Sequence, residues 1–422
     1  MTRTGKKKGG RRHLCSCVKQ PSTPLRAMKI TLRDWLLSLH FMPLEFGMLL
    51  TLFMFCIAPT YAVWSLMLLA SGSLCTVALL VVLPLAPLKS RGTHHVGIRH
   101  LTRDLAVYYP TFIKPIEGES WLPGNDSFYI HVMAATARVG TRWLKHLKLV
   151  KIPCTRNASI VSLMTHDGAP RKVFILSHTL TAHHLAYSQL ALALAASGAL
   201  VYSVLHSDCI DISVEKSMDH APVDENEGKS LLELGLSEEL MEVHLERRIE
   251  DIVGTIEGIS GGQLLRQLHV GPVELQSFLS SGSKINLIGH GFGALTMLAV
   301  AMKTPAIVPC IYSITALDAW PLGLLERAVG GKVSMPLHIR VQLVDSEEWC
   351  ERRNYSTLVE ELRVKLSSTG VSCLRTTCSG TDHRSIMDMG LLLPLMKRKR
   401  FASRKSAKLI PLMAKEVLQF AE

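Results

Sequence analysis

One short stretch near the middle of the chain constrains its fold more than any other. The run Ile285–Ile288 is short and, apart from Asn286, apolar, as is typical of a buried strand. It meets Gly289-His290-Gly291-Phe292-Gly293 and then an apolar segment, Ala294–Met302, that has no internal glycine or proline. Glycines let the backbone turn tightly and let a helix pack close to a strand. The stretch therefore predicts a strand, a sharp turn and a helix.

A strand, a turn and a helix around Gly-x-Ser-x-Gly make the nucleophile elbow of α/β-hydrolases. Gly289 and Gly293 match the outer positions of that motif, and His290 matches the variable position before its centre. The centre differs, because Gly291 stands where such hydrolases have their serine. The stretch predicts a hydrolase fold without the usual hydrolase nucleophile.

The rest of the chain after residue 95 alternates between predicted strands and helices. Strands are predicted at 105–110, 173–177, 199–205, 311–317, 337–344 and 371–377, and helices at 187–197, 238–256, 357–366 and 409–420. Such alternation is typical of a mostly parallel sheet covered by helices on both faces. Residues 259–283, which are punctuated by glycine and serine, lead into the elbow strand. Residues 206–236 are expected to form an acidic insertion or lid.

The segment between Glu45 and Lys89 contains no charged residue over 43 positions. A bilayer core needs about 20 apolar residues for each helix, so the run suits two helices. Pro59 is the natural break between spans at about 41–58 and 61–83. The predicted organisation is a basic tail (1–40), a transmembrane helical hairpin (41–88) and an α/β-hydrolase domain (95–422).

The net charge of +12 is concentrated at the two ends of the chain. Residues 1–33 hold ten Lys and Arg, and residues 397–408 hold seven. Basic tails beside an apolar segment favour a membrane partner over a nucleic acid. No zinc-type Cys/His pattern and no RNA-binding aromatic motif is present in the sequence. Cys15-x-Cys17 in the tail is either an acylation site or a pair of free thiols.

The side of the membrane on which the globular domain lies has two readings. Basic residues flank the apolar segment on both sides, which places both ends of a hairpin in the cytosol. The sequons at Asn125, Asn157 and Asn354 favour the alternative, a single span with a luminal domain. The helical stretch 129–148, basic and aromatic, either rests on the membrane interface or packs on the core.

Two residues after the elbow have the order and setting of a hydrolase acid and base. Asp318 ends an apolar strand, and His383 lies in a polar loop after the last strand. Nucleophile, acid and histidine follow in this order along the chain in α/β-hydrolases. The oxyanion hole needs two backbone N–H groups, one of them from the residue after the nucleophile. We assign these donors to Phe292 and to Leu180, which lies in the loop after strand 173–177.

Taken together, motifs spread over about residues 107–388 resemble the plasma-type platelet-activating-factor acetylhydrolases, the group VII phospholipases A2. The resemblance is carried by Val107-Tyr-Tyr-Pro110, Trp121-Leu-Pro123, Gly140-Thr-x-Trp143, Phe174-Ile-Leu-Ser-His-x-Leu180, Tyr187-Ser188, Leu194-Ala-x-x-Gly198, Lys284-Ile-x-x-Ile-Gly-His-x-Phe-Gly293, Ala316-Leu-Asp-Ala-Trp-Pro-Leu-Gly323 and Gly380-x-x-His383.

The resemblance implies cleavage of short or oxidised sn-2 acyl chains from phospholipids, without metal or cofactor. It implies Asp318 as the acid, His383 as the base, and Leu180 and Phe292 as oxyanion donors. Two departures stand out. Gly291 replaces the serine, and His178-Thr-Leu-Thr181 replaces the family's His-Gly-x-Gly in the oxyanion loop.

Three interpretations follow from these departures. The chain is an impaired or inactive membrane-anchored lipid esterase, a lipid-binding or scaffolding pseudoenzyme, or one variant copy of an active gene. Without a serine hydroxyl no acyl-serine forms. We expect His290 to point away from the site, and Ser313 and Cys209 lie on other predicted elements.

Overall fold

A nine-stranded sheet is the centre of the computed structural model, which describes residues 64, 67, 70, 71, 92–137, 141–207, 237–282, 284–331, 333–352, 354–392 and 406–422. The strand order is β11-β10-β9-β8-β6-β7-β2-β1-β5. The strands are β1 (His95–His100), β2 (Leu105–Thr111), β5 (Thr155–Arg156), β6 (Val173–Ser177), β7 (Leu200–Val204), β8 (Ile285–His290), β9 (Ile311–Leu317), β10 (Arg340–Ser346) and β11 (Cys373–Cys378). A separate small sheet pairs β3 (Glu119–Ser120) with β4 (Lys151–Ile152).

Most of the large sheet is parallel, which confirms the predicted α/β class. From β11 across to β7 every neighbouring pair is parallel, whereas β2 runs antiparallel to both β7 and β1. The carboxyl ends of parallel strands lie at one edge of a sheet, where ligands bind in such folds. This edge carries the elbow, the end of β9 and the loop after β11.

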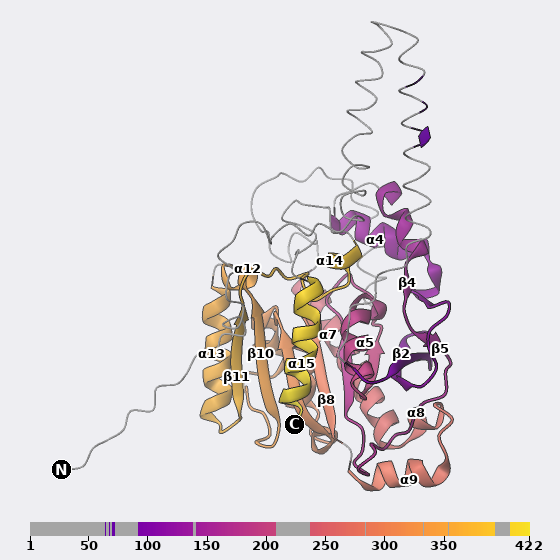
Figure 1. The fold of residues 1–422 in the computed structure, drawn as a ribbon. Coiled ribbons are helices and arrows are strands. Elements are labelled where there is room, and N and C mark those ends of the chain that lie inside the picture. Colours follow the sequence, from indigo (N-terminus) through magenta and orange to yellow (C-terminus); the bar gives the residue numbers. More distant parts are fainter. Residues whose placement is uncertain are drawn as a thin grey trace, which may run out of the picture.

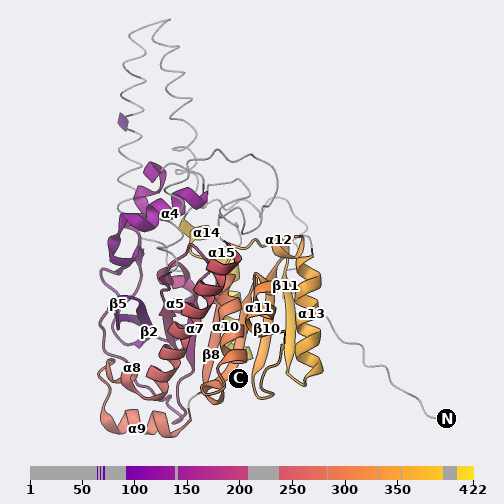
Figure 2. The same ribbon diagram turned by 180° about the vertical axis from the view of Figure 1, so that it is seen from behind.

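Helices cover both faces of the sheet. Figure 1 shows α5 (Ser188–Ala196) and α15 (Ser406–Phe420) over one face, and Figure 2 shows α7 (Glu238–Ser260), α10 (Phe292–Lys303) and α11 (Leu322–Ala328) over the other. Helix α13 (Tyr355–Ser368) packs beside β11. The shorter helices are α8 (Gln263–Arg266), α9 (Pro272–Ser280), α12 (Glu347–Cys350) and α14 (Met389–Leu392), with 3-10 turns η2 (Pro123–Asn125), η4 (His184–Tyr187) and η6 (Val308–Cys310).

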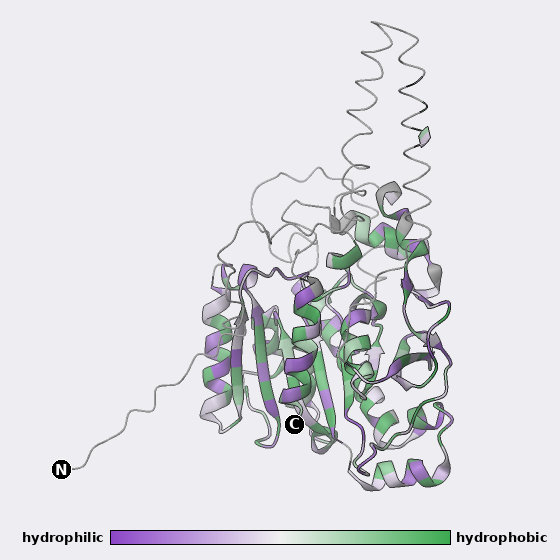
Figure 3. Ribbon diagram, viewed as in Figure 1, coloured by the Kyte–Doolittle hydropathy of each residue, from purple (hydrophilic) through white to green (hydrophobic). Residues whose placement is uncertain are grey.

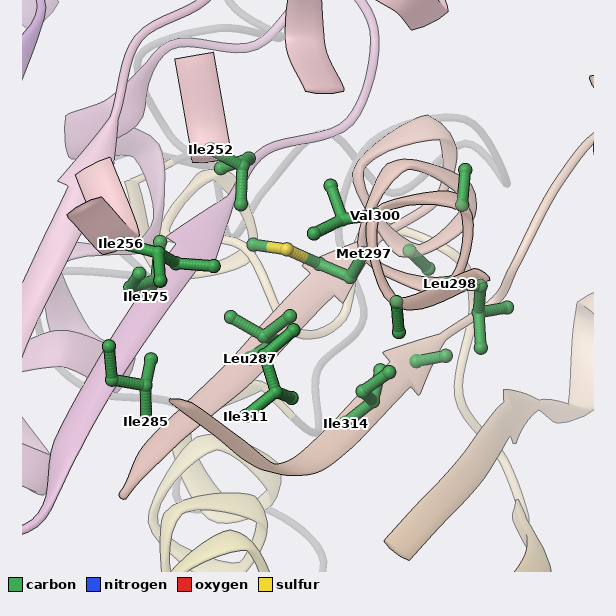
Figure 4. Packing of buried hydrophobic residues seen from close by; sticks show 14 of the residues in the cluster. Ile175, Ile252, Ile256, Ile285, Leu287, Met297, Leu298, Val300, Ile311 and Ile314 are labelled. Atoms are coloured by element: carbon green, nitrogen blue, oxygen red, sulfur yellow. The ribbon is translucent and has the colours of Figure 1, made fainter. Parts of the chain in front are cut away.

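Apolar side chains from the strands and from the facing helices form the core. Figure 4 shows Ile175 and Leu287 packed against Ile252 and Met297, and all four are fully buried. Figure 3 shows hydrophobic strands at the centre and hydrophilic residues on the outer faces of the helices. Burying one such side chain contributes about 1.5–3 kcal/mol. This core fixes the sheet edge on which the site residues lie.

The structure adds detail to one segment and corrects the prediction for another. Residues 259–283, which lead into the elbow strand, contain α8 (Gln263–Arg266) and α9 (Pro272–Ser280). Pro272 stands in the first turn of α9, a position that proline favours, so the glycine and proline there mark helix boundaries. The stretch 129–148 is not one helix but α4 (Ser127–Ala137) and a 3-10 helix, η3 (Thr141–Leu149).

Several sequence-based predictions lie largely outside the described residues. These are the basic tail, the transmembrane hairpin, residues 208–236 of the acidic insertion, and most of the basic cluster at 397–408. Within the described part of the chain, no helix combines the length and the apolar character needed to cross a bilayer.

Candidate active site

The elbow forms at the predicted place, between β8 and α10. Gly291 has φ 57° and ψ −118°, a conformation that favours glycine, and its N–H donates to the carbonyl of Leu317 at 2.8 Å. A Cβ atom on Gly289 would lie 2.3 Å from the carbonyl oxygen of Gly293. A Cβ atom on Gly293 would lie 2.3 Å from the carbonyl oxygen of Ser177. Gly289 and Gly293 are therefore required by the close approach of helix, strand and neighbouring loop, whereas a side chain at Gly291 would meet the side chain of Thr179.

Asp318 and His383 come together as an acid–base pair. Asp318 follows β9, is buried, and accepts hydrogen bonds from the Ser346 N–H at 2.6 Å and the Ser346 hydroxyl at 2.8 Å. Nδ1 of His383 lies 3.0 Å from Oδ2 of Asp318. A carboxylate only accepts, so Nδ1 carries the proton and donates. Nε2 of His383 is therefore left to accept a proton, as a general base must.

The surroundings of the pair keep Asp318 ionised and His383 neutral. Burial opposes ionisation of Asp318, but the nearby ring of His290 and the hydrogen bond from His383 outweigh it and hold the pKa of Asp318 well below its usual value. Burial, with His290 and Arg352 nearby, lowers the pKa of His383 to about 4, and Asp318 offsets this only in part. A neutral imidazole at pH 7 is the form that removes a proton from an attacking oxygen.

His290 does not point away from the site as predicted. Its ring centroid lies 4.2 Å from that of His383, and its Nε2 is 3.9 Å from Oδ2 of Asp318. Its Nδ1 lies 2.6 Å from the hydroxyl of Tyr187, which itself accepts from the Thr179 N–H at 3.2 Å. Because the Tyr187 hydroxyl donates its hydrogen bond to Nδ1 of His290, the imidazole proton of His290 is on Nε2, which faces the carboxylate of Asp318. His290 thus supports the charge of Asp318.

Aromatic stacking fixes the other face of the base. The ring of Trp349 stacks on His383 with centroids 4.4 Å apart and planes 15° apart. The guanidinium of Arg352 lies 3.4 Å from the centroid of the Trp349 ring. The backbone N–H of His383 also donates to Glu348 at 3.1 Å. These contacts orient the imidazole, and sequence reasoning missed them because α12 is too short to show a periodic pattern.

The two assigned oxyanion donors flank the elbow. Phe292 is the first residue of α10, and Leu180 lies in the loop after β6. Within the described ranges, neither backbone N–H donates to a main-chain carbonyl. Thr181, the next residue, has φ 63°, a left-handed conformation in the position where the family has glycine. The loop therefore keeps a glycine-like backbone at this position although its side chain has changed.

Thr179 is the residue that sequence analysis overlooked. Its Oγ1 lies 3.5 Å from Nε2 of His383. A Cβ atom built on Gly291 would lie 2.3 Å from this same oxygen and 3.1 Å from the Thr179 Cβ. The threonine hydroxyl thus occupies space that a serine side chain at 291 would need. The two departures from the family motif, distant in sequence, meet in one place.

A second Ser–His–Asp array lies beneath the oxyanion loop. Oγ of Ser177 is 2.9 Å from Nε2 of His206, whose Nδ1 is 2.7 Å from Oδ2 of Asp251. Ser177 is fully buried and His206 nearly so. The backbone N–H of His206 donates to Nε2 of His178 at 3.2 Å, so the array braces the loop that begins at His178.

Of Ser313 and Cys209, which were predicted to lie on other elements, only Ser313 is within the described part of the chain. Ser313 is buried in β9 and donates to Oδ1 of Asn286 at 2.7 Å. Cys209 lies outside the described residues. Over the described ranges, the side chains His290, Asp318 and His383 are a group whose ligand atoms lie within 4.8 Å of one another, as metal binding would require. Their contacts are those of a hydrogen-bonded acid–base group.

Comparisons with known proteins agree with this architecture. The sequence model of platelet-activating factor acetylhydrolase, isoform II, matches residues 88–422. No curated protein sequence matches the chain significantly. Among solved structures, a ferulic acid esterase from Streptomyces cinnamoneus is similar at 13% identity and a TM-score of 0.48, covering 81% of this chain and 91% of its own. A monoacylglycerol lipase from Paleococcus ferrophilus is similar at 12% identity and a TM-score of 0.35, covering 61% and 97%. Because both TM-scores are below 0.5, the assignment depends on the family match and the elbow.

Proposed function

Because the chain belongs to the platelet-activating factor acetylhydrolase family, we propose that it hydrolyses the sn-2 ester of phospholipids that carry a short acyl chain there. The observation that carries the proposal is the 3.0 Å contact between Nδ1 of His383 and Asp318, which leaves Nε2 as a base at neutral pH. A neutral base oriented by a buried acid is the arrangement that general-base catalysis requires.

The proposed reaction uses residues that the fold already orients. His383 takes a proton from the attacking oxygen and later returns it to the leaving glycerol oxygen. Asp318 stabilises the imidazolium that forms in between. The N–H groups of Leu180 and Phe292 stabilise the negative charge on the carbonyl oxygen, and one such donor accounts for about 10²–10³ in kcat. None of these roles needs a serine at position 291.

The test is product analysis with the full-length protein in detergent micelles. We expect release of acetate and a lysophospholipid from 1-alkyl-2-acetyl-phosphocholine, with slower or no release from the analogue that has a long sn-2 chain. His383→Ala abolishes the release, and His166→Ala, which removes an exposed histidine on a distant turn, leaves it unchanged. Equal release by native protein and His383→Ala would overturn the proposal.

Gly291 favours a second candidate function, a lipid-binding protein without turnover. Loss of the nucleophile in a hydrolase lowers kcat by about 10⁶. Saturable binding of the same phospholipid, with no product even after prolonged incubation, is the outcome expected of this candidate. Product formation that depends on His383 excludes it.

A membrane anchor and a cytosolic domain are further parts of the proposal. They are supported by the uncharged run between Glu45 and Lys89 and by the basic residues on either side of it. We expect membrane association that resists high salt and alkaline washing, whereas release by salt alone would leave only the basic tails as the contact. Asn157 and Asn354 are exposed, so both sequons are sterically open to glycosylation. Glycans on either one would show a luminal domain instead.

A further inference from the structure

We propose that Thr179 is the nucleophile of this site, a residue that takes over the hydroxyl lost at Gly291. The inference rests on the proposed function, because it names the attacking group of that reaction. Oγ1 of Thr179 lies 3.5 Å from Nε2 of His383. In unliganded sites such catalytic hydrogen bonds are often long and tighten when substrate binds.

The position of the hydroxyl supports this role. A Cβ atom on Gly291 would lie 2.3 Å from Oγ1 of Thr179 and 3.2 Å from Cε1 of His383. A serine side chain from the elbow would therefore begin where the threonine hydroxyl now lies. The hydroxyl reaches the face of the base that the elbow serine of the family motif would reach, but from the neighbouring loop.

Proton positions in the site allow only one direction for the contact. Nδ1 of His383 donates to Asp318, so Nε2 has a lone pair and no proton. The threonine hydroxyl must then donate to Nε2, which is the polarity of an activated nucleophile. Burial favours the neutral imidazole and keeps this polarity at pH 7.

The backbone around Thr179 is held in place from two sides. Its N–H donates to the hydroxyl of Tyr187 at 3.2 Å, and the preceding carbonyl, that of His178, accepts from the guanidinium of Arg248 at 2.6 Å. A nucleophile must stay within a few tenths of an ångström of its reactive geometry. The loop carrying Thr179 is therefore anchored as an elbow would be.

The oxyanion donors remain suited to the changed nucleophile. One donor normally comes from the residue after the nucleophile and the other from the neighbouring loop. With Thr179 as nucleophile, the first is Leu180 and the second is Phe292. The same two N–H groups serve, with their roles exchanged.

The reaction balances with water as the only co-reactant. Oγ1 of Thr179 attacks the ester carbonyl carbon as its proton passes to Nε2 of His383. The bond from carbonyl carbon to the sn-2 oxygen then breaks, and that oxygen takes the proton from Nε2, leaving an acyl-threonine ester. Water attacks this ester, gives one proton to Nε2, and releases the carboxylic acid as Oγ1 regains its proton.

Ser177 is the competing hydroxyl in the same segment. It is fully buried, and its Oγ contacts Nε2 of His206 rather than the site base. An ester of a phospholipid cannot reach it without displacing the oxyanion loop. Thr179, in contrast, is only partly buried at its contact with His383, and its hydroxyl lies beside the Asp318–His383 pair.

The experiment labels the nucleophile and removes it in parallel. The full-length protein is treated with an alkyl fluorophosphonate, which loses fluoride to a hydroxyl nucleophile, and the adduct is located by fragment mass spectrometry. Hydrolysis of the 2-acetyl phospholipid is measured on the native chain and on Thr179→Val, Thr179→Ser and Thr357→Val. Valine keeps the shape of threonine without its hydroxyl, and Thr357, which is exposed on α13, provides the same change outside the site.

We expect the adduct on Thr179, turnover lowered by about 10³-fold or more in Thr179→Val, and turnover retained in Thr179→Ser and Thr357→Val. Full turnover in Thr179→Val with loss in His383→Ala would overturn this inference and show direct activation of water, with the proposed function intact. An adduct on Ser177 would also overturn it. If the native chain shows neither an adduct nor turnover, both this inference and the proposed function are overturned.

Discussion

A Cβ atom at position 291 would lie 2.3 Å from Oγ1 of Thr179, so a side chain at 291 would require the threonine hydroxyl to move. The family motif has serine at the first position and glycine at the second, whereas this chain has glycine at the first and threonine at the second. The exchange keeps one hydroxyl beside His383, and it keeps a glycine at the position that faces this hydroxyl. The two departures are therefore one coupled change.

Restoring the serine alone is predicted to fail. Gly291→Ser places a side chain against Thr179 at a positive φ, and we expect it to lower the free energy of unfolding by about 1–3 kcal/mol. The double change Thr179→Gly with Gly291→Ser removes the clash and rebuilds the family arrangement. Its turnover should exceed that of Gly291→Ser. Hydrolysis assays and denaturant unfolding test both variants, and an active, fully stable Gly291→Ser protein would contradict the coupling.

The pH profile should report a base with a lowered pKa. Burial, His290 and Arg352 bring the pKa of His383 to about 4, so it stays neutral well below pH 6.5. We expect kcat/KM to remain level from about pH 8 down to about pH 5 and to fall only when Nε2 is protonated. An acid limb with a midpoint near 6.5, the ordinary histidine value, would contradict the assigned environment.

The same shift makes the fold sensitive to acid, and its sign can be worked out. In the unfolded chain His383 binds its proton at an ordinary pKa of about 6.5, whereas the folded chain resists it until about 4. Between these values the unfolded state holds more protons, so stability falls as the pH falls. His383→Gln, which cannot titrate, should show a shallower loss of stability over this window in denaturant unfolding.

Gly293 is predicted to be intolerant of any side chain. A Cβ there would lie 2.3 Å from the carbonyl oxygen of Ser177, a backbone atom that cannot move aside easily. We expect Gly293→Ala to lower the free energy of unfolding by about 1–3 kcal/mol. Gly254→Ala is the matched control, because Gly254 lies in α7 with nothing within 4 Å of an added Cβ. The control should raise stability slightly, since alanine favours helix.

Asp388 is predicted to be a structural anchor rather than a catalytic acid. Its buried carboxylate accepts from the Trp121 ring N–H at 3.0 Å, from the Ser188 N–H and hydroxyl, and from the Gln189 N–H at 3.1 Å. Asp388→Asn turns an amide toward these donors and should lower the unfolding free energy by about 1–3 kcal/mol. Asp167→Asn on an exposed turn is the control. Equal stability in both variants would show that the anchor is not needed.

Sequence patterns predicted the sheet and the Asp318–His383 pair because both depend on local signals. Apolar runs such as Ile311–Leu317 mark strands, and the order of acid and histidine along the chain follows from the fold. The pattern did not reveal Thr179, since its role depends on a contact with His383, 204 residues away. His290 was misplaced for a similar reason: its ring direction is set by Tyr187, on a different element. No helix was predicted at 259–283, where the glycines and Pro272 lie at helix boundaries and the helices α8 and α9 are short.

The most direct test of the proposed hydrolysis is whether the native chain, with glycine at 291, turns over a 2-acetyl phospholipid at all. The measurement is the rate of acetate release from a 2-acetyl phospholipid by native protein and His383→Ala under identical conditions. We expect multiple turnovers by the native protein and a rate of acetate release lowered by about 10²-fold or more in His383→Ala. Equal rates in the two proteins, or no release above the uncatalysed rate, would contradict the proposed hydrolysis.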